Sequence, residues 1–547
     1  PDRRVLIDGD RVVAIDGGGA APPGALAIDG RGKTLVPGLI DAHAHVFERA
    51  ALEQALAFGV TTVLDMFTAP ALAASLRADP RPDHADLRSA GLLATAPGGH
   101  GTEYAVEVPT LTRPDQAQAW VDARVAEGSD YIKIVFDDGR AYQRKLPTLD
   151  DATFAAVVAA AHRAGKRAVV HVGDLDHAQR AIELGADGLV HLFRDHTPPP
   201  GFGASVAAHH AFVTPTLAVT RGLYGTRSQL ADDPALAPYL PPAARAVLGM
   251  QFPLHPIGEP GAATQAIAQL RAARAPILCG TDAPNPGTAF GASVHDELAQ
   301  LVDAGLSPLE ALTAATQAPA TAYGLADRGR IAPGARADLV LVDGDPTVDI
   351  RATRRIAAIW RGGVRFDRDA FRARVAAAVT AGVAAPVGAL GLVSDFDHDL
   401  AAHPGQAWIA STDGSSTVAL ATVAGANGSP GALAVTGAVA AGKLRAWAGA
   451  LWSPGATAFL PVDLSARRGL TFWARGDGRP YTVMVFSQRR GFLPSAHAFQ
   501  PGPAFARVHL DWADFDGGDG KDVTAIFIGQ AAGPGAFALA IDDVRLE

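Results

Sequence analysis

The sequence predicts an α/β protein built on a (β/α)8 TIM barrel. A small composite β-sandwich is expected on the flanks of the barrel, and an all-β, jelly-roll-like sandwich after it. Three observations predict this fold class: apolar runs that alternate with Ala-rich segments, β-type runs on both sides of that alternation, and a change to short strands near residue 393. At 547 residues the chain is too long for one core, because a domain averages ~150 residues. The expected parts are 1–34 and 325–385 for the small sandwich with its linker, 35–324 for the barrel, and 393–547 for the C-terminal sandwich.

The small sandwich is predicted from short β-type runs at both ends of the central region. Residues 4–7 and 11–15 are such runs, separated by Gly- and Asp-containing turns. Similar runs follow much later, at 337–343 and 356–363. Because the N-terminal runs cannot form a domain alone, we expect the two flanks to combine in one small β domain.

The central region alternates strands with helices. Its apolar runs lie at 35–46, 59–66, 86–96, 131–136, 167–172, 188–193, 212–219 and 276–282. Helical segments are expected at 151–164, 176–184 and 293–304. Eight strands that alternate with helices over ~250 to 300 residues are typical of a (β/α)8 barrel, and a doubly wound open sheet is the alternative. A barrel predicts that the chemistry lies at the C-terminal ends of its strands.

Polar side chains occupy those strand ends. His43 and His45 close the first run, and side chains at positions i and i+2 of a strand point to the same face. Both imidazoles would therefore reach one metal ion. An isolated His-x-His pair is usually packed or solvated by chance. Here four more candidate ligands lie on later strands, and the combination predicts a metal site. They are Lys133, His171, His191 and Asp282.

Lys133 interrupts an apolar strand, where a protonated amine would repel metal ions. Burial and nearby cations both lower the pKa of a lysine, so a neutral amine is expected here. A neutral amine reacts with carbon dioxide to give a carbamate, and the two carbamate oxygens can bridge two divalent ions. We expect zinc, with manganese, iron or cobalt as alternatives. Without the surrounding histidines, a lysine extended to the rim would be the expected arrangement.

Composition and charge exclude several kinds of partner. The formal net charge is −9 and no basic cluster stands out, so nucleic acid is not expected. Two uncharged stretches, 375–394 and 415–442, are rich in small or polar residues, so no membrane span is expected. The single cysteine, Cys279, excludes an intrachain disulfide. If a leader preceded Pro1, a periplasmic or secreted location is expected, and a cytoplasmic one otherwise.

These motifs resemble the binuclear-metal branch of the amidohydrolase superfamily, which includes prolidase-like and imidazolonepropionase-like enzymes. The resemblance covers roughly residues 1–385 and also includes the segments 35–41 and 334–340. It implies that His43, His45 and Asp282 hold one metal ion. It further implies that His171 and His191 hold the other ion, and that carboxylated Lys133 bridges the two.

The same resemblance implies a bridging hydroxide as nucleophile, with Asp282 moving its proton to the leaving group. The implied reaction is hydrolysis of a C–N amide bond in a dipeptide, an N-acyl amino acid or a related small-molecule amide. Alternatives are hydrolysis of a lactone, a phosphotriester or a cyclic amide on the same site. From another class, the alternative is a glycan- or surface-binding protein whose barrel is a scaffold.

Substrate contacts are predicted from a Gly-rich loop at 96–104. It resembles the Gly-Gly-His-Gly loop of prolidase-like amidohydrolases, in which that histidine and a tyrosine after strand seven contact substrate. The resemblance implies this role for His100 and Tyr224, and an ordinary loop position is the alternative for both. Asp195 and His196 are candidates to orient His191. His295 and Glu297 open the helix after the eighth run and could be further partners of the metal ligands, but we expect them to decorate a helix face.

The C-terminal region has motifs similar to those of the complex I intermediate-associated family, whose fold is like galactose-binding domains. The motifs lie at 393–397, 472–476 and 540–546. This similarity makes carbohydrate a candidate partner, with Trp447, Trp452 or Trp512 as stacking platforms. The alternatives are tryptophans buried in a sandwich core, and a domain that packs on the barrel or on a sister subunit in a homo-oligomer.

Overall fold

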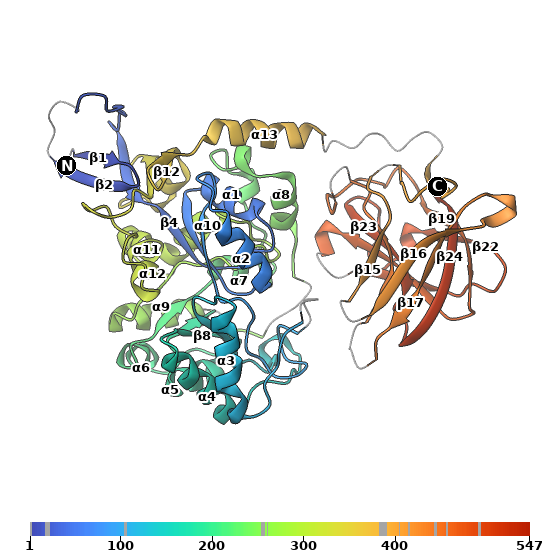
Figure 1. Cartoon of the computed structure of the whole chain (residues 1–547), viewed down its shortest axis with the longest axis horizontal. Helices are drawn as coiled ribbons and strands as arrows, with labels where there is room; N and C mark the ends of the chain where they lie inside the picture. The colour runs from blue at the N-terminus through green and yellow to red at the C-terminus, as the bar shows by residue number, and fades with distance from the viewer. Residues whose placement is uncertain are drawn as a thin grey trace. The chain divides into compact units, whose positions relative to one another are not determined.

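The fold is described from a computed structural model of the chain (Figure 1). It describes residues 3–16, 22–102, 107–252, 257–259, 261–381, 391–403, 405–413, 416–441, 446–455, 458–490 and 494–547. The chain divides into two compact units. The first consists of Pro1–Thr102, Glu107–Leu240 and Leu254–Arg374, and the second of Glu103–Val106, Pro241–Pro253 and Val375–Glu547.

Parallel strands form the centre of the first unit, in two ladders. The shorter ladder contains β4 (Leu39–Ala44), β5 (Val60–Asp65) and β6 (Asp86–Ser89). The longer contains β7 (Ile132–Val135), β8 (Ala168–His171), β9 (Gly188–Val190) and β10 (Phe212–Thr214). Most residues of these strands are buried, because both faces of each strand are covered. This burial explains why the strands appear in the sequence as continuous apolar runs.

Isolated parallel bridges connect the two ladders. Ala94 pairs with Ile134 of β7, so the chain after β6 reaches the longer ladder. On the other side, the segment 276–282, expected as the eighth strand, makes single bridges and no ladder. Val213 of β10 pairs with Ile277, and Ala44 of β4 pairs with Ala283. Its extended conformation ends at Asp282, whose φ is 59°.

Helices follow most of these strands, and Figure 1 shows α3, α4 and α5 outside β8. The helices of the first unit are α1 (Ala50–Ala57), α2 (Pro70–Ala78), α3 (Ala117–Ala126), α4 (Asp151–Arg163), α5 (Leu175–Glu183), α6 (Phe202–Ala208), α7 (Leu217–Leu223), α9 (Ala262–Ala273), α10 (Ala292–Asp303), α11 (Pro308–Ala314) and α12 (Gln317–Ala322). Helix α8 (Pro242–Gly249) belongs to the second unit, and α13 (Arg368–Ala381) crosses the boundary.

The three predicted helices are confirmed as α4, α5 and α10, within one residue at each end. Asp150 and Asp174 begin α4 and α5, because each carboxylate accepts a hydrogen bond from a backbone N–H of the first turn. Among the described helices, none combines the length and the apolar composition that crossing a bilayer requires.

The two flanks of the first unit meet in one antiparallel sheet. Its strands are β3 (Lys33–Pro37), β11 (Leu339–Asp343), β12 (Ile356–Arg361) and β13 (Val364–Arg365). The hairpin of β1 (Arg4–Asp8) and β2 (Arg11–Asp16) packs against this sheet, and Val12 shares a small core with Ala337 and Leu339. Segments about 300 residues apart thus form one β layer, as the β-type runs predict.

An ion-pair cluster joins this β layer to the parallel strands. Asp86, at the start of β6, accepts a hydrogen bond from Arg328 at 2.7 Å and also pairs with Arg336 and Arg361. The three arginine side chains are 4 to 16 % exposed. Burial acts against ionisation of Asp86, but the three guanidinium groups hold its pKa below the ordinary value.

We expect Asp86→Asn to lower the free energy of unfolding by about 2 to 4 kcal/mol, because it leaves partly buried arginines without their shared carboxylate. Urea denaturation measures this change. The matched control is Asp115→Asn, which removes an exposed partner of Arg113 and should produce no measurable change. Equal effects of the two substitutions would contradict the structural role of Asp86.

The second unit is an antiparallel sandwich of two sheets. One sheet contains β14 (Leu392–Ser394), β16 (Thr417–Val423), β17 (Ala432–Val439), β19 (Gly469–Gly476), β22 (Ala506–Asp511) and β24 (Gly535–Leu546). The other contains β15 (Ile409–Thr412), β18 (Ala448–Trp452), β20 (Tyr481–Ser487), β21 (Ser495–Phe499) and β23 (Val523–Gln530). Apolar side chains from both sheets, such as Phe472 and Ile528, fill one shared core.

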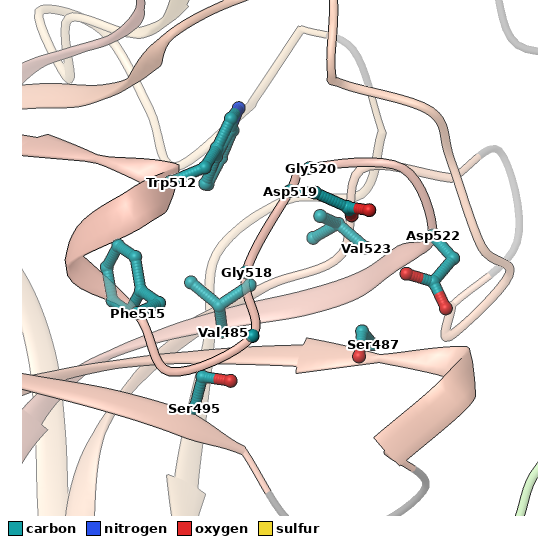
Figure 2. A pocket seen from close by; sticks show the side chains of 11 residues that line it. Val485, Ser487, Ser495, Trp512, Phe515, Gly518, Asp519, Gly520, Asp522 and Val523 are labelled. Atoms are coloured by element: carbon teal, nitrogen blue, oxygen red, sulfur yellow. The ribbon is translucent and has the colours of Figure 1, made fainter.

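This core contains two of the tryptophans considered as stacking platforms. Trp452 is fully buried and Trp512 is 5 % exposed, so neither presents a free face to a sugar, and both follow the alternative of tryptophans in a sandwich core. The indole N–H of Trp512 donates to the carbonyl of Arg467 at 2.9 Å. Figure 2 shows Trp512 beside a hollow lined by Phe515 and Asp519, with room for about one water molecule. Trp447 packs against a smaller cluster around Phe527.

Candidate metal centre

The structure brings the predicted histidine ligands together at the C-terminal ends of the parallel strands. His43 lies on β4 and His45 just after it, while His171 ends β8 and His191 follows β9. Their rings form a continuous row, with centroids 5.4 Å apart for His45 and His43, 4.6 Å for His43 and His191, and 4.6 Å for His191 and His171. Strands that are distant in sequence therefore deliver four imidazoles to one place.

Asp282 completes this group. Its Oδ1 lies 2.9 Å from Nε2 of His45 and 3.3 Å from Nε2 of His43. The ligand atoms of Asp282, His43 and His191 all lie within 4.8 Å of one another. Both ring nitrogens of His43, Nδ1 of His45 and Oδ1 of Asp282 are buried. Despite the short distances, none of these atoms has, among the described residues, a partner with the geometry of a hydrogen bond. Buried polar atoms without partners are unfavourable, and a divalent cation would satisfy them, so the donor set fits a metal ion.

The electrostatics of the site favour metal ligation. Burial lowers the pKa of His43 to about 3 and that of His171 to about 4, and it lowers the pKa of His191 well below its ordinary value. The imidazoles are therefore neutral at pH 7, and a neutral imidazole has a lone pair for a metal. Burial alone would raise the pKa of Asp282, but His43 and His191 hold it well below its ordinary value.

Lys133 lies among these groups. It is on β7 and is 3 % exposed. Burial lowers its pKa to about 7, against the opposing influence of Asp282 and Asp65. Its charge in turn contributes to the lowered pKa of His43 and His171, which places its amine within electrostatic reach of the row of histidines. A substantial fraction of this amine is thus neutral near pH 7.

A buried aspartate holds the two halves of the site together. Asp41 accepts hydrogen bonds from the hydroxyl of Thr281 at 2.7 Å and from its backbone N–H at 3.1 Å. The backbone N–H of Asp282 donates to the carbonyl of His43 at 2.7 Å. At Gly280, a Cβ atom would lie 2.8 Å from Cβ of His43, so only glycine allows this approach. The Gly-Thr-Asp sequence therefore docks against β4 and sets the position of Asp282.

Two histidines have polar partners that sequence reasoning missed. Nε2 of His171 lies 3.2 Å from Oδ2 of Asp137, and Nδ1 of His191 lies 2.8 Å from the hydroxyl of Thr216. Such contacts fix ring orientation, as the outer partners of metal-ligating histidines do. Asp137 directly follows a predicted strand and could have been found by the rule of polar strand ends. His191, Thr216 and Asp282 also have positive φ angles, which is strained for these residue types.

The expectation that Asp195 and His196 orient His191 is wrong. Oδ1 of Asp195 accepts a hydrogen bond from the backbone N–H of Leu175 at 3.0 Å, and Nδ1 of His196 lies 3.1 Å from Oε1 of Glu259. Both side chains therefore have polar partners other than His191.

The expectation that His295 and Glu297 decorate a helix face is also wrong, because both are buried on α10. The ring of His295 contacts the hydroxyl of Thr353 and the carbonyl of Phe58, each at 3.0 Å. Oε2 of Glu297 accepts a hydrogen bond from the backbone N–H of Ala218 at 2.6 Å, at the start of α7. Since α7 follows Thr216, Glu297 supports the turn that carries the partner of His191.

The two predicted substrate residues lie at different depths. The ring of His100 is 4.7 Å from that of His171, so it extends the row of imidazoles. Tyr224 follows α7, is 44 % exposed and lies with its ring 5.4 Å from Cζ of Arg194. Residues 103–104 of the predicted loop lie outside the described residues.

The sequence signature of the Amidohydrolase family matches residues 34–366, which contain every predicted ligand. The chain belongs to the amidohydrolase family. Imidazolonepropionase from Streptomyces griseus subsp. griseus is 26 % identical over 406 residues, covering 66 % of this chain and 92 % of that protein.

Solved structures show the same fold. A Xaa-Pro dipeptidase with methionine bound in its active site has a TM-score of 0.53 and 21 % identity, covering 66 % of this chain and 94 % of that one. Phenylurea hydrolase B has a TM-score of 0.53 and 24 % identity, covering 67 % and 93 %. This amidohydrolase thus has a TIM-barrel domain with an additional β domain, and it is a metal-dependent hydrolase of C–N bonds.

Glu297 makes a testable contribution to stability. Burial raises its pKa to about 8, above the ordinary value of 4.5, so the folded protein keeps this carboxyl protonated while the unfolded chain ionises it. The stability that the protonated Glu297 contributes is complete below the pKa of this carboxyl in the unfolded chain. It is lost as the pH rises through the pKa of the carboxyl in the folded protein. Between pH 6 and 8 this loss is on the order of 2 kcal/mol.

We expect the Tm of Glu297→Gln, relative to the native protein, to rise between pH 6 and pH 8, because glutamine cannot ionise. Thermal denaturation at several pH values measures this difference. The control is Glu310→Gln. The pKa of the Glu310 carboxyl is lowered to about 2, so the Tm difference between this variant and the native protein should stay constant from pH 6 to pH 8. A constant Tm difference for Glu297→Gln would contradict the raised pKa.

Proposed function

We propose that this amidohydrolase is a binuclear metal enzyme that hydrolyses the C–N amide bond of a dipeptide, an N-acyl amino acid or a related amide. The observation that carries this proposal is the set of buried ligand atoms without hydrogen-bond partners among the described residues, on His43, His45 and Asp282. Family membership and the C–N hydrolases among its relatives support the reaction class.

In this proposal His43, His45 and Asp282 would hold one ion, and His171 and His191 would hold the second. Lys133 would be a ligand to both as a carbamate: its neutral amine nitrogen forms a C–N bond to carbon dioxide and releases one proton. The pKa of about 7 supports this step, because the neutral amine is the reactive form. Two divalent ions, with zinc as the proposed metal, would lower the pKa of a bound water toward ~7 and polarise the substrate carbonyl.

The side chains of the chain supply the remaining steps. The carboxylate of Asp282 would accept a proton from the attacking water and return it to the nitrogen of the departing amine, which leaves as the neutral amine. His100, beside His171, and Tyr224 contact the substrate at the mouth. Asp137 and Thr216 hold the rings of His171 and His191 in orientation.

We further propose that the parallel strands close into a (β/α)8 barrel over 35–324. The bridges from β10 to 276–282 and on to β4 support this closure. In the same proposal, 1–34 and 325–385 form the small sandwich with its linker, and 393–547 is an independent sandwich of the galactose-binding type. The two antiparallel sheets with one shared core support the last assignment.

Replacement of Asp282 by Asn tests the proton-transfer role. The amide oxygen can still bind a metal but cannot carry the proton, so we expect kcat to fall by a factor of ~10² to 10⁴ while substantial metal remains bound. Elemental analysis after desalting and kcat on a panel of dipeptides and N-acyl amino acids measure the two quantities. Lactones and phosphotriesters are the substrate controls.

Near-normal rates in Asp282→Asn would refute its assigned role. A native protein that retains no divalent ion from metal-replete medium would refute the metal enzyme and favour a scaffold barrel.

Lys133 is tested by a direct signal for the carbamate. Protein equilibrated with ¹³C-labelled carbon dioxide and divalent metal should show a carbamate carbon resonance by NMR, and Lys133→Met should lack it. The control is Lys145→Met, at an exposed lysine, which should keep the resonance. A native protein with bound metal and no carbamate signal would contradict the proposed bridge.

A further inference from the structure

Three loops bring polar side chains together beside the metal centre. Tyr142 lies in the loop after β7, Arg194 three residues beyond His191, and Tyr224 at the end of α7. The main chain of 257–259 crosses over this group. The backbone N–H of Ile257 donates to the carbonyl of Ala141, and that of Glu259 donates to the carbonyl of Arg194, each at 2.9 Å.

Gly258 allows this cover to approach closely. A Cβ atom at this position would lie 1.9 Å from the hydroxyl oxygen of Tyr224, so a larger residue would collide with the phenol. The segment 257–259 and the three loops thus pack against one another. We call the group of Arg194, Tyr142 and Tyr224 the Arg194 subsite.

Arg194 carries a positive charge that lacks a carboxylate partner. Among the described residues, no carboxylate oxygen lies within 4.0 Å of its guanidinium group, and its buried Nε has no hydrogen-bond partner. Burial lowers the pKa of Arg194, which shows that the surroundings disfavour the cation. Arg194 is half-buried, and the hydroxyl of Tyr224 partly stabilises its charge. A desolvated cation is further stabilised by an opposite charge, so an anion is the expected occupant.

Glu297, the carboxyl group whose charge acts on the pKa of Arg194, does not compensate this charge. Glu297 influences Arg194, but its Oε2 is bound to the N–H of Ala218. Burial also raises the pKa of Glu297 to about 8, so the carboxyl is neutral at pH 7. The positive charge of the subsite therefore remains available to a ligand.

Tyr142 couples the Arg194 subsite electrostatically to the metal centre. The pKa of Tyr142 is raised by burial and, in addition, by the charges of Asp137 and Asp282. Its phenol therefore lies within electrostatic reach of a predicted metal ligand and of the partner of His171. A substrate whose carbonyl carbon is at the metals would extend one end toward Arg194.

A carboxylate is a chemical match for the Arg194 subsite. A guanidinium presents parallel N–H donors that match the two oxygens of a carboxylate, and tyrosine hydroxyls can donate further hydrogen bonds. In a dipeptide or an N-acyl amino acid, one carbon separates the carboxylate from the scissile amide nitrogen. Both groups can therefore be bound at once by neighbouring sites.

We propose that Arg194, assisted by Tyr142 and Tyr224, binds the carboxylate that lies one carbon from the scissile nitrogen, and so selects amides of α-amino acids over uncharged amides. This inference rests on the proposed amide hydrolysis and names its substrate class. Phenylureas and amide-capped peptides lack this carboxylate and would leave the arginine unpaired.

The first test compares Arg194→Met and Arg194→Lys with the native holoenzyme. The substrates are an N-acyl amino acid and the same compound with its carboxylate capped as an amide. We expect the ratio of kcat/KM for the free acid to that for the capped compound to fall about 100-fold in Arg194→Met, mainly through KM. Arg194→Lys should recover part of this ratio, since it keeps the charge and loses the bidentate geometry.

The matched control is Arg330→Met, which removes an exposed arginine of the same unit and should preserve the ratio. Metal content is measured for every variant. An unchanged ratio in Arg194→Met with bound metal, or equal losses on both substrates, would overturn the proposal.

A second measurement separates this proposal from the proposed function. Isothermal titration with N-acetyl amino acids measures carboxylate binding whether or not the native protein hydrolyses them. If the native protein binds the N-acetyl amino acid and Arg194→Met binds it about 100-fold more weakly, Arg194 binds the carboxylate. This conclusion holds even if the enzyme cleaves another kind of bond. Equal binding by both proteins, or absence of binding by the native holoenzyme, would overturn it. Hydrolysis confined to lactones or phosphotriesters would refute the proposed function alone.

Discussion

The contact between Asp41 and Thr281 is the constraint on which the site depends. It holds the segment that carries Asp282 against the strand that carries His43. The close backbone approach at Gly280 and the hydrogen bond from Asp282 to the carbonyl of His43 act in the same direction. Because this segment forms no ladder of its own, these few contacts replace the regular pairing that positions the other ligands.

Burial is the common physical cause of the unusual electrostatics around this centre. It lowers the pKa of His43 and Lys133 and raises that of Asp41 and Glu297. In each case the surroundings disfavour the charged form. The result is a set of neutral nitrogen ligands around one ionised carboxylate, Asp282, which is the protonation state that a divalent cation requires.

The C-terminal unit shows how aromatic composition can mislead about function. The alternation of aromatic residues with Gly and Asp correctly indicated short antiparallel strands. It did not indicate which aromatic residues are available to a ligand. Trp452 and Trp512 lie in the core because each strand of a sandwich presents one face inward, and the large apolar side chains fill that space.

The sequence by itself predicted the parallel strands β4 to β10, three of the helices and six candidate ligands, whose role as ligands stays a prediction. Strand ends and the two-residue period of a strand are local properties, so His43, His45 and His171 could be found without coordinates. Asp137, one residue beyond a predicted strand, was within reach of the same rule. Only the tertiary structure decided the partners of these residues, such as Thr216 for His191 and Glu297 for the start of α7. The Arg194 subsite could likewise not be predicted from the sequence. Loops far apart in the chain bring its residues together, and no local sequence pattern encodes the distance between those loops.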